Sequence, residues 1–140
     1  SVNAFLVFPE VPDKATAVLV IHEIFGLSDW VRSLTAQLAE AGYIALAPDL
    51  LSGMAPGGGG TAELGGPDGA RRVIATLPPE QITADLNAAV AYLAQLPASN
   101  GKVASGGLRL LRQWPDLGRR GGSHRLPGLR LLRRKRCPGE

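Results

Sequence analysis

Glu23 is the first residue whose type and position could do chemistry. It follows a short apolar run, residues 17–21, with turn residues on both sides. Such a run predicts a strand that is buried on both faces. Ligands of open α/β sheets bind beyond the carboxyl ends of the strands, and a carboxylate there can act as a base or as a charge partner. Glu23 is therefore a candidate catalytic residue.

Ile24 is the second candidate, through its backbone rather than its side chain. Its N–H group lies in the predicted turn before a helix, where it could donate a hydrogen bond to a developing oxyanion. A plainer interpretation stays open for Glu23, which could be solvated or could stabilise the start of the next helix by its charge. His22 points to the opposite face of a continuing strand, and we assign it no role in chemistry.

A strand–helix–strand unit positions these residues. The first strand is 17–21, the helix that follows is capped by Ser28 or Asp29 and ended by Gly42, and the second strand is 43–47. The short connections predict a parallel pair with a right-handed crossover. The helix carries an apolar stripe of Leu27, Val31, Leu34, Leu38 and Ala41. We also predict strands over residues 3–8 and from residue 102 onward, and helices over residues 68–77 and 79–96. The fold class is α/β.

Two segments read as irregular structure. Residues 52–69 include four consecutive glycines and predict a flexible surface loop. A phosphate cradle is rejected there, because neither a lysine followed by Ser or Thr nor a spaced glycine pattern at a strand–helix junction is present. Asn100-Gly101 predicts a turn before the strand that begins at Lys102.

The charge of the chain is divided. Residues 1–103 contain five basic and ten acidic side chains, a net charge of −5, so a total of +3 leaves +8 for residues 104–140. The single cysteine, Cys137, excludes an intrachain disulfide and a cysteine-rich metal site. No stretch approaches the roughly 18 apolar residues that cross a bilayer, and the start has no signal-peptide pattern. We expect a cytoplasmic protein without a membrane partner.

Three segments follow one another in an order and spacing that are typical of one enzyme family. They are Val20–Leu27, with the turn Glu-Ile-Phe-Gly, Gly42–Leu51, with Ala-Pro-Asp-Leu at the end of a strand, and Ser99–Ala104. In these the chain resembles the dienelactone hydrolase family of carboxymethylenebutenolidase-like enzymes, over about residues 2–103. The resemblance implies an α/β-hydrolase fold that is incomplete here, with only the N-terminal strands and helices of a mostly parallel sheet.

The resemblance also implies a Cys-His-Asp triad with the cysteine on a nucleophile elbow. The residue matching Glu23 contacts the resting cysteine and helps to generate the thiolate. The residue matching Ile24 supplies one N–H group of the oxyanion hole. The family uses neither a metal nor an organic cofactor, and its substrates are enol lactones and related esters.

The nucleophile of that triad is not found. Its position falls on Arg109, whose guanidinium stays protonated, and Ser105 lies too early for an elbow. Gly53 stands where the family often has an arginine for the substrate carboxylate, which leaves the exact substrate open. His124 and Cys137 lack the surroundings of a catalytic base or nucleophile.

Residues 104–140 form a basic tail of Arg, Leu, Gly and Pro that begins abruptly within a motif. We interpret it as disordered, or as the product of a frame change near Leu108, because a shifted frame of GC-rich DNA favours these residues. The alternative is a non-catalytic protein that binds nucleic acid or anionic surfaces through this tail. Nucleic acid is the less favoured partner, since Trp114 is the tail's only aromatic residue for stacking on bases.

The sequence therefore predicts a hydrolase that acts on lactone or ester bonds by nucleophilic acyl transfer, with a small-molecule substrate and no cofactor. Because the nucleophile, Asp and His are not found, we expect this chain itself to be inactive. An incomplete sheet exposes unpaired strand edges, which predicts self-association.

Overall fold

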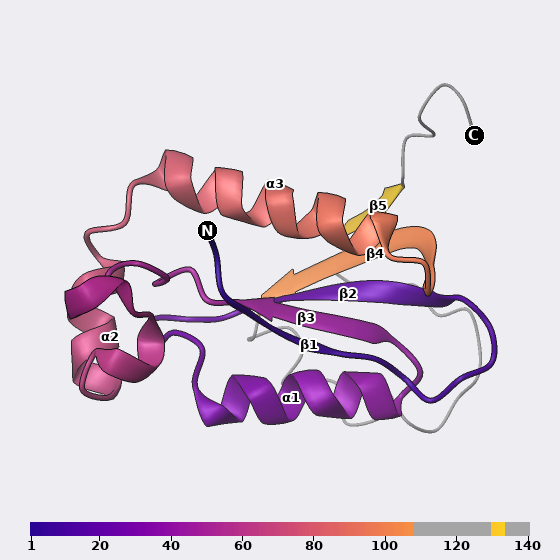
Figure 1. Ribbon diagram of the computed structural model, residues 1–140, viewed down its shortest axis with the longest axis horizontal. Coiled ribbons are helices and arrows are strands. Elements are labelled where there is room, and N and C mark those ends of the chain that lie inside the picture. Colours follow the sequence, from indigo (N-terminus) through magenta and orange to yellow (C-terminus); the bar gives the residue numbers. More distant parts are fainter. Residues whose placement is uncertain (108–129, 134–140) are drawn as a thin grey trace.

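The computed structural model describes residues 1–107 and 130–133, and a five-stranded sheet with the order β1-β3-β2-β4-β5 forms its centre (Figure 1). β2 pairs in parallel with β3 and with β4, and its pairing with β3 confirms the predicted parallel pair. β1 runs antiparallel to β3, and β5 antiparallel to β4. The strands are β1 (Ala4–Val7), β2 (Ala15–Ile21), β3 (Ile44–Pro48), β4 (Ser99–Gly107) and β5 (Arg130–Arg133).

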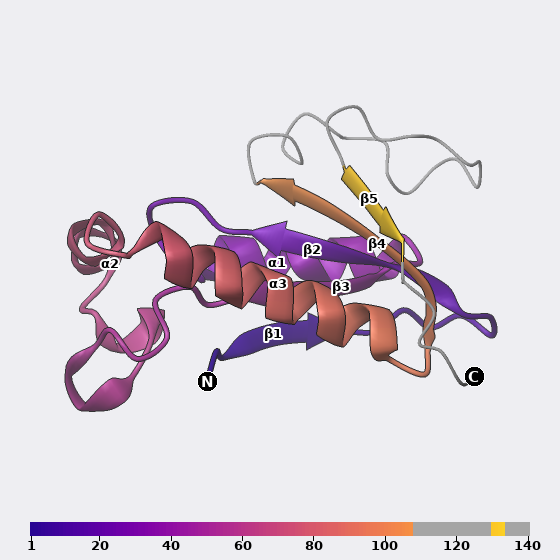
Figure 2. The same ribbon diagram turned by 90° about the horizontal axis from the view of Figure 1, so that it is seen from above.

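Helices cover both faces of the sheet. α1 (Asp29–Glu40) lies on one face and α3 (Pro79–Gln95) on the other, while α2 (Pro67–Ile74) lies beyond the carboxyl ends of the parallel strands (Figures 1 and 2). α1 and α3 fall within the predicted segments, and α2 begins one residue before the predicted 68–77 and ends three residues earlier. The α/β class is confirmed, because parallel strands alternate with helices that cover them.

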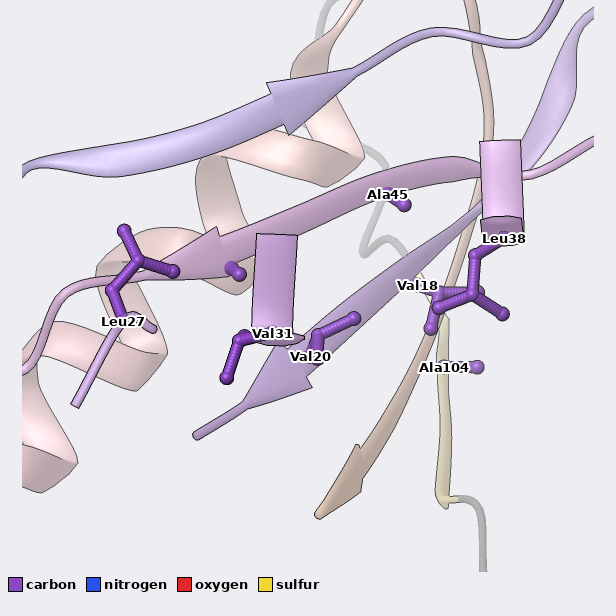
Figure 3. Close-up of a cluster of buried hydrophobic side chains, with 8 residues drawn as sticks. Val18, Val20, Leu27, Val31, Leu38, Ala45 and Ala104 are labelled. Carbon is purple, nitrogen blue, oxygen red and sulfur yellow. The ribbon is translucent and has the colours of Figure 1, made fainter. Parts of the chain in front are cut away.

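The core has two layers because side chains alternate along β2. Val18 and Val20 pack against Val31 and Leu38 of α1 (Figure 3). On the other face, Leu19 belongs to a cluster with Leu93 of α3 and residues of β3 and β4. This explains why β2 reads as a continuous apolar run: each face of the strand is buried under a helix.

Both ends of α1 are set by capping residues next to the helix. Ser28 is the N-cap, and its hydroxyl oxygen accepts a hydrogen bond from the Val31 N–H at 3.5 Å. After the helix, Gly42 has a φ of +95°, a left-handed conformation that glycine adopts without a Cβ penalty. The predicted caps at both ends are confirmed.

β4 begins before the predicted position. The expected turn at Asn100-Gly101 lies inside the strand, where the register with β2 shifts between Ala15 and Ala17. Gly101 has a φ of +79° there. The prediction of a turn was wrong, because the same Asn-Gly chemistry is accommodated as an irregularity within the strand.

β4 also continues past Val103, the predicted end of the hydrolase-like part, to Gly107. β5 pairs along the outer side of β4, with Lys102 opposite Arg133 and Ser105 opposite Arg130. The predictions for Arg109, His124, Cys137 and a frame change near Leu108 lie outside the described residues.

The loop after β3 is not the flexible surface loop that its glycines predicted. It contains two short 3₁₀ turns, Pro56–Gly58 and Thr61–Glu63. Ala55 is buried within it, and the Gly59 carbonyl accepts hydrogen bonds from the N–H groups of Gly53 and Ala55. The loop is anchored because its own backbone groups pair with each other and one of its side chains enters the core.

Leu38 tests the packing of α1 on the sheet. Its side chain is 1% exposed, so Leu38→Ala should lower the free energy of unfolding by about 2–5 kcal/mol through lost contacts and a residual cavity. The neighbouring Gln37 is exposed, and Gln37→Ala should change the value by less than about 0.5 kcal/mol. Chemical denaturation of both variants measures the difference. Equal effects of the two substitutions would contradict this packing.

Candidate active site

The turn between β2 and α1 presents both predicted site residues at the carboxyl end of the middle strand. The Glu23 carbonyl accepts a hydrogen bond from the Gly26 N–H at 3.2 Å, which closes the turn. Gly26 has a φ of +70°. The side chains of Glu23, Ile24 and Phe25 are exposed, so they face solvent beyond the end of the sheet.

Two polar groups of this turn could take part in a reaction. Among the residues that the structure describes, neither the Glu23 carboxylate nor the Ile24 N–H has a hydrogen-bond partner. The exposed side chains of Ile24 and Phe25, each 44% accessible, follow Glu23 directly in the turn. A negative charge, a backbone donor and an apolar surface are therefore presented by the same short segment.

The end of β4 lies beside this turn. Val20 pairs with Gly106 and Ile21 with Gly107, the last described residue of β4 before the gap. Ser105 lies further back in the strand, opposite Leu19. It therefore occupies the interior of a strand and not a strand-to-helix elbow.

His22 is buried and joins the ends of β2 and β3. Its Nε2 accepts a hydrogen bond from the Leu50 N–H at 3.0 Å, and its Nδ1 lies 2.8 Å from the Glu23 carbonyl oxygen. These partners place the proton on Nδ1, because a carbonyl can only accept. Burial lowers the pKa of His22 below its usual 6.5, although the bond to Glu23 and the charge of Asp49 oppose the shift. His22 is thus a structural link, as the sequence indicated.

Asp49 is the buried carboxylate of this region, and sequence reasoning did not assign it a role. Its side chain is 5% exposed. Oδ1 accepts from the Leu51 N–H at 3.1 Å and from the Thr61 hydroxyl at 2.6 Å. Oδ2 accepts from the Thr61 N–H at 2.8 Å. Hydrogen bonds offset the cost of burying this charge.

Thr61 connects that carboxylate to the candidate turn. Its hydroxyl oxygen accepts a hydrogen bond from the Leu27 N–H at 3.0 Å, across 34 residues of sequence. One feature of the sequence could have indicated a role for Asp49: it is an acid that directly follows a buried strand, at Pro48-Asp49. A carboxylate buried at that position needs hydrogen-bond donors nearby. The partner could not be read from the sequence, because Thr61 lies in a loop whose composition indicates no fixed position.

Residues 1–107 and 130–133 contain no group of three or more His, Cys, Asp or Glu side chains that could hold a metal ion. None of the helices in these ranges combines the length and apolar character needed to cross a membrane.

The lowered pKa of His22 predicts a pH-dependent stability. The neutral ring favours the folded state, so the free energy of unfolding should decrease as the pH falls below 6.5 and level off once the folded protein is also protonated. Urea unfolding between about pH 5 and 7.5 measures this slope. His22→Gln should flatten it, whereas His124→Gln, which removes the other histidine, should not. The same slope in both variants would contradict the assignment.

Comparisons with known proteins agree with this architecture. The model of the "Dienelactone hydrolase family" matches residues 2–108. A Pseudomonas putida protein named "Carboxymethylenebutenolidase" is 35% identical over 99 residues, which cover 66% of this chain and 40% of that protein. A Synechocystis protein named "Putative carboxymethylenebutenolidase" is 34% identical over 98 residues, which cover 69% of this chain and 39% of that protein.

A solved structure supports the fold. The crystal structure of a Klebsiella pneumoniae protein named "Putative Dienelactone Hydrolase" superposes with a TM-score of 0.59 at 24% identity, covering 76% of this chain and 43% of that one. The chain thus spans about two fifths of the length of the curated relatives named above. Since the family model matches more than half of the chain, the protein belongs to the dienelactone hydrolase family.

Proposed function

We propose that the turn at the end of β2 is one half of a hydrolase site that opens lactones or esters by nucleophilic acyl transfer. Glu23 is the charge partner of the nucleophile and takes its proton. The Ile24 N–H donates to the oxygen that becomes negative when the carbonyl is attacked. In such a reaction a carboxylate within hydrogen-bond reach of a thiol or hydroxyl accepts its proton when the carbonyl is attacked, and a fixed backbone donor stabilises the tetrahedral intermediate.

The observation that carries this proposal is the unpaired state of both groups. Within the described residues, the Glu23 carboxylate and the Ile24 N–H lack partners. Membership of the dienelactone hydrolase family supports hydrolysis as the reaction class. The exposed Ile24 and Phe25 side chains offer an apolar surface that fits a small lactone or ester better than a highly charged molecule. A cytoplasmic location and self-association through sheet edges stay predictions of the sequence.

Hydrolysis of a chromogenic ester tests whether this chain is a complete enzyme. The nucleophile position falls on Arg109, so we expect no turnover above that of the Glu23→Gln variant. The assay compares the full chain with this variant over a range of substrate concentrations. Clear turnover that Glu23→Gln abolishes would contradict the predicted inactivity and show that the site is complete.

An introduced thiol tests Glu23 without requiring turnover. In the variant Arg109→Cys with Cys137→Ser, the rate of alkylation by iodoacetamide against pH gives the pKa of the new thiol. If Glu23 is its charge partner, the carboxylate raises that pKa, and a further Glu23→Gln substitution should lower it by about one unit.

The matched control is Glu80→Gln, which removes an equal charge at an exposed position of α3. It should leave the thiol pKa unchanged within about 0.2 units, because Glu80 is exposed to solvent and the proposed contact with the nucleophile belongs to Glu23. An equal effect of the two substitutions, or none from Glu23→Gln, would rule out Glu23 as the partner.

A further inference from the structure

We propose that Asp49 and Thr61 are positioning residues of the candidate site, acting through a clasp that fixes the turn from Glu23 to Gly26. The clasp consists of the Asp49 carboxylate, the Thr61 hydroxyl and the Leu27 N–H. The inference deepens the proposed function and rests on it, because the clasp sets where the Glu23 carboxylate and the Ile24 N–H are held.

The direction of each hydrogen bond in the clasp is fixed by chemistry. The ionised Asp49 carboxylate can only accept, so the single proton of the Thr61 hydroxyl points to Oδ1, 2.6 Å away. A lone pair of the same oxygen is then available to the Leu27 N–H at 3.0 Å. Removing the hydroxyl would therefore leave the Leu27 N–H without its acceptor and Asp49 Oδ1 with the Leu51 N–H as its remaining donor.

The clasp holds only one end of the turn, and His22 holds the other. The His22 ring accepts from the Leu50 N–H immediately before the turn, whereas Thr61 accepts from Leu27 immediately after it. Leu50 and Thr61 both belong to the segment that follows β3. The four residues from Glu23 to Gly26 are thus held between two attachment points on a single neighbouring segment.

Two glycines permit this close approach. A Cβ atom on Gly26 would lie 2.3 Å from the Thr61 hydroxyl oxygen, and one on Gly60 would lie 2.4 Å from Asp49 Oδ2. Real Cβ atoms do not approach other heavy atoms so closely. Any larger residue at Gly26 must displace Thr61, whose methyl carbon would also lie only 2.8 Å from the new Cβ.

Position matters here because an oxyanion donor acts only at short range. A useful donor lies about 2.7–3.1 Å from the developing charge, and a displacement of about 1 Å can cost about a hundredfold in rate. Ile24 is an exposed residue whose N–H has no partner among the described residues, so its own hydrogen bonds do not fix it. The attachments of its neighbours at His22 and Leu27 must do so.

Amide hydrogen exchange measured by NMR on the full chain tests the clasp without a hydrolysis assay. Thr61→Val keeps the shape but removes the hydroxyl, and it should speed exchange at Leu27 about tenfold and shift the Ile24 amide resonance. Amides of β3, such as Leu46, should keep their exchange rates within about twofold. Thr61→Ser retains the hydroxyl and should restore both signals of the wild-type protein.

Other outcomes overturn the inference. It fails if Leu27 exchange in Thr61→Val stays within twofold of wild type, if Thr61→Ser behaves like Thr61→Val, or if exchange rises equally throughout the sheet. A negative result in the ester or thiol experiments bears on the proposed function alone, since the amide signals report the turn whether or not the protein is an enzyme.

A pair of glycine variants keeps the test decisive should Thr61→Val not fold. Gly26 and Gly42 both have positive φ, at +70° and +95°, but only Gly26 lies against Thr61, whereas nothing lies within 4 Å of a Cβ on Gly42. Gly26→Ala should shift the Ile24 and Leu27 resonances, and Gly42→Ala should leave them in place. Equal shifts in the two variants would show backbone strain rather than loss of the clasp.

Discussion

The attachment of one short turn at both of its ends is the constraint on which the candidate site depends. His22 and Leu27 flank the turn, and each is hydrogen bonded to the segment that follows β3. β2 and β3 are parallel neighbours, so the residues that follow the two strands emerge at the same edge of the sheet. The exposed side chains of Glu23 to Phe25 therefore need no packing of their own to be held in place.

Much of the scaffold could be predicted, because its strands and helices follow from patterns of residues that are close together in the sequence. The continuous apolar runs of β2 and β3 follow from helices on both faces of the sheet, and α1 follows from its stripe, the Ser28 cap and Gly42. The start of β4 could not be predicted, because an Asn-Gly pair favours a turn unless pairing with a neighbouring strand absorbs it. The register shift opposite Ala15 and Ala17 does so here.

The candidate site was predictable only in part, for a related reason. Glu23 and Ile24 were found because a carboxylate and a turn at the end of a buried strand are adjacent in sequence. Thr61 was missed because its contacts to Leu27 and Asp49 lie 34 and 12 residues away. The glycines of its loop indicate flexibility by composition, whereas Gly60 serves a close approach to Asp49. Composition does not distinguish these two uses of glycine.

Two carboxylates near this edge of the sheet, Asp49 and Glu23, differ in their burial and in their hydrogen bonds. Asp49 is buried, and its oxygens accept hydrogen bonds from Leu51 and Thr61, so protonating or removing it would leave buried donors unpaired. Glu23 is exposed, and within the described residues it accepts no side-chain hydrogen bond. Only a carboxylate with free lone pairs can take a proton from a reacting group without breaking the fold. In the proposed site, Asp49 therefore holds the turn and Glu23 is the carboxylate that takes the proton.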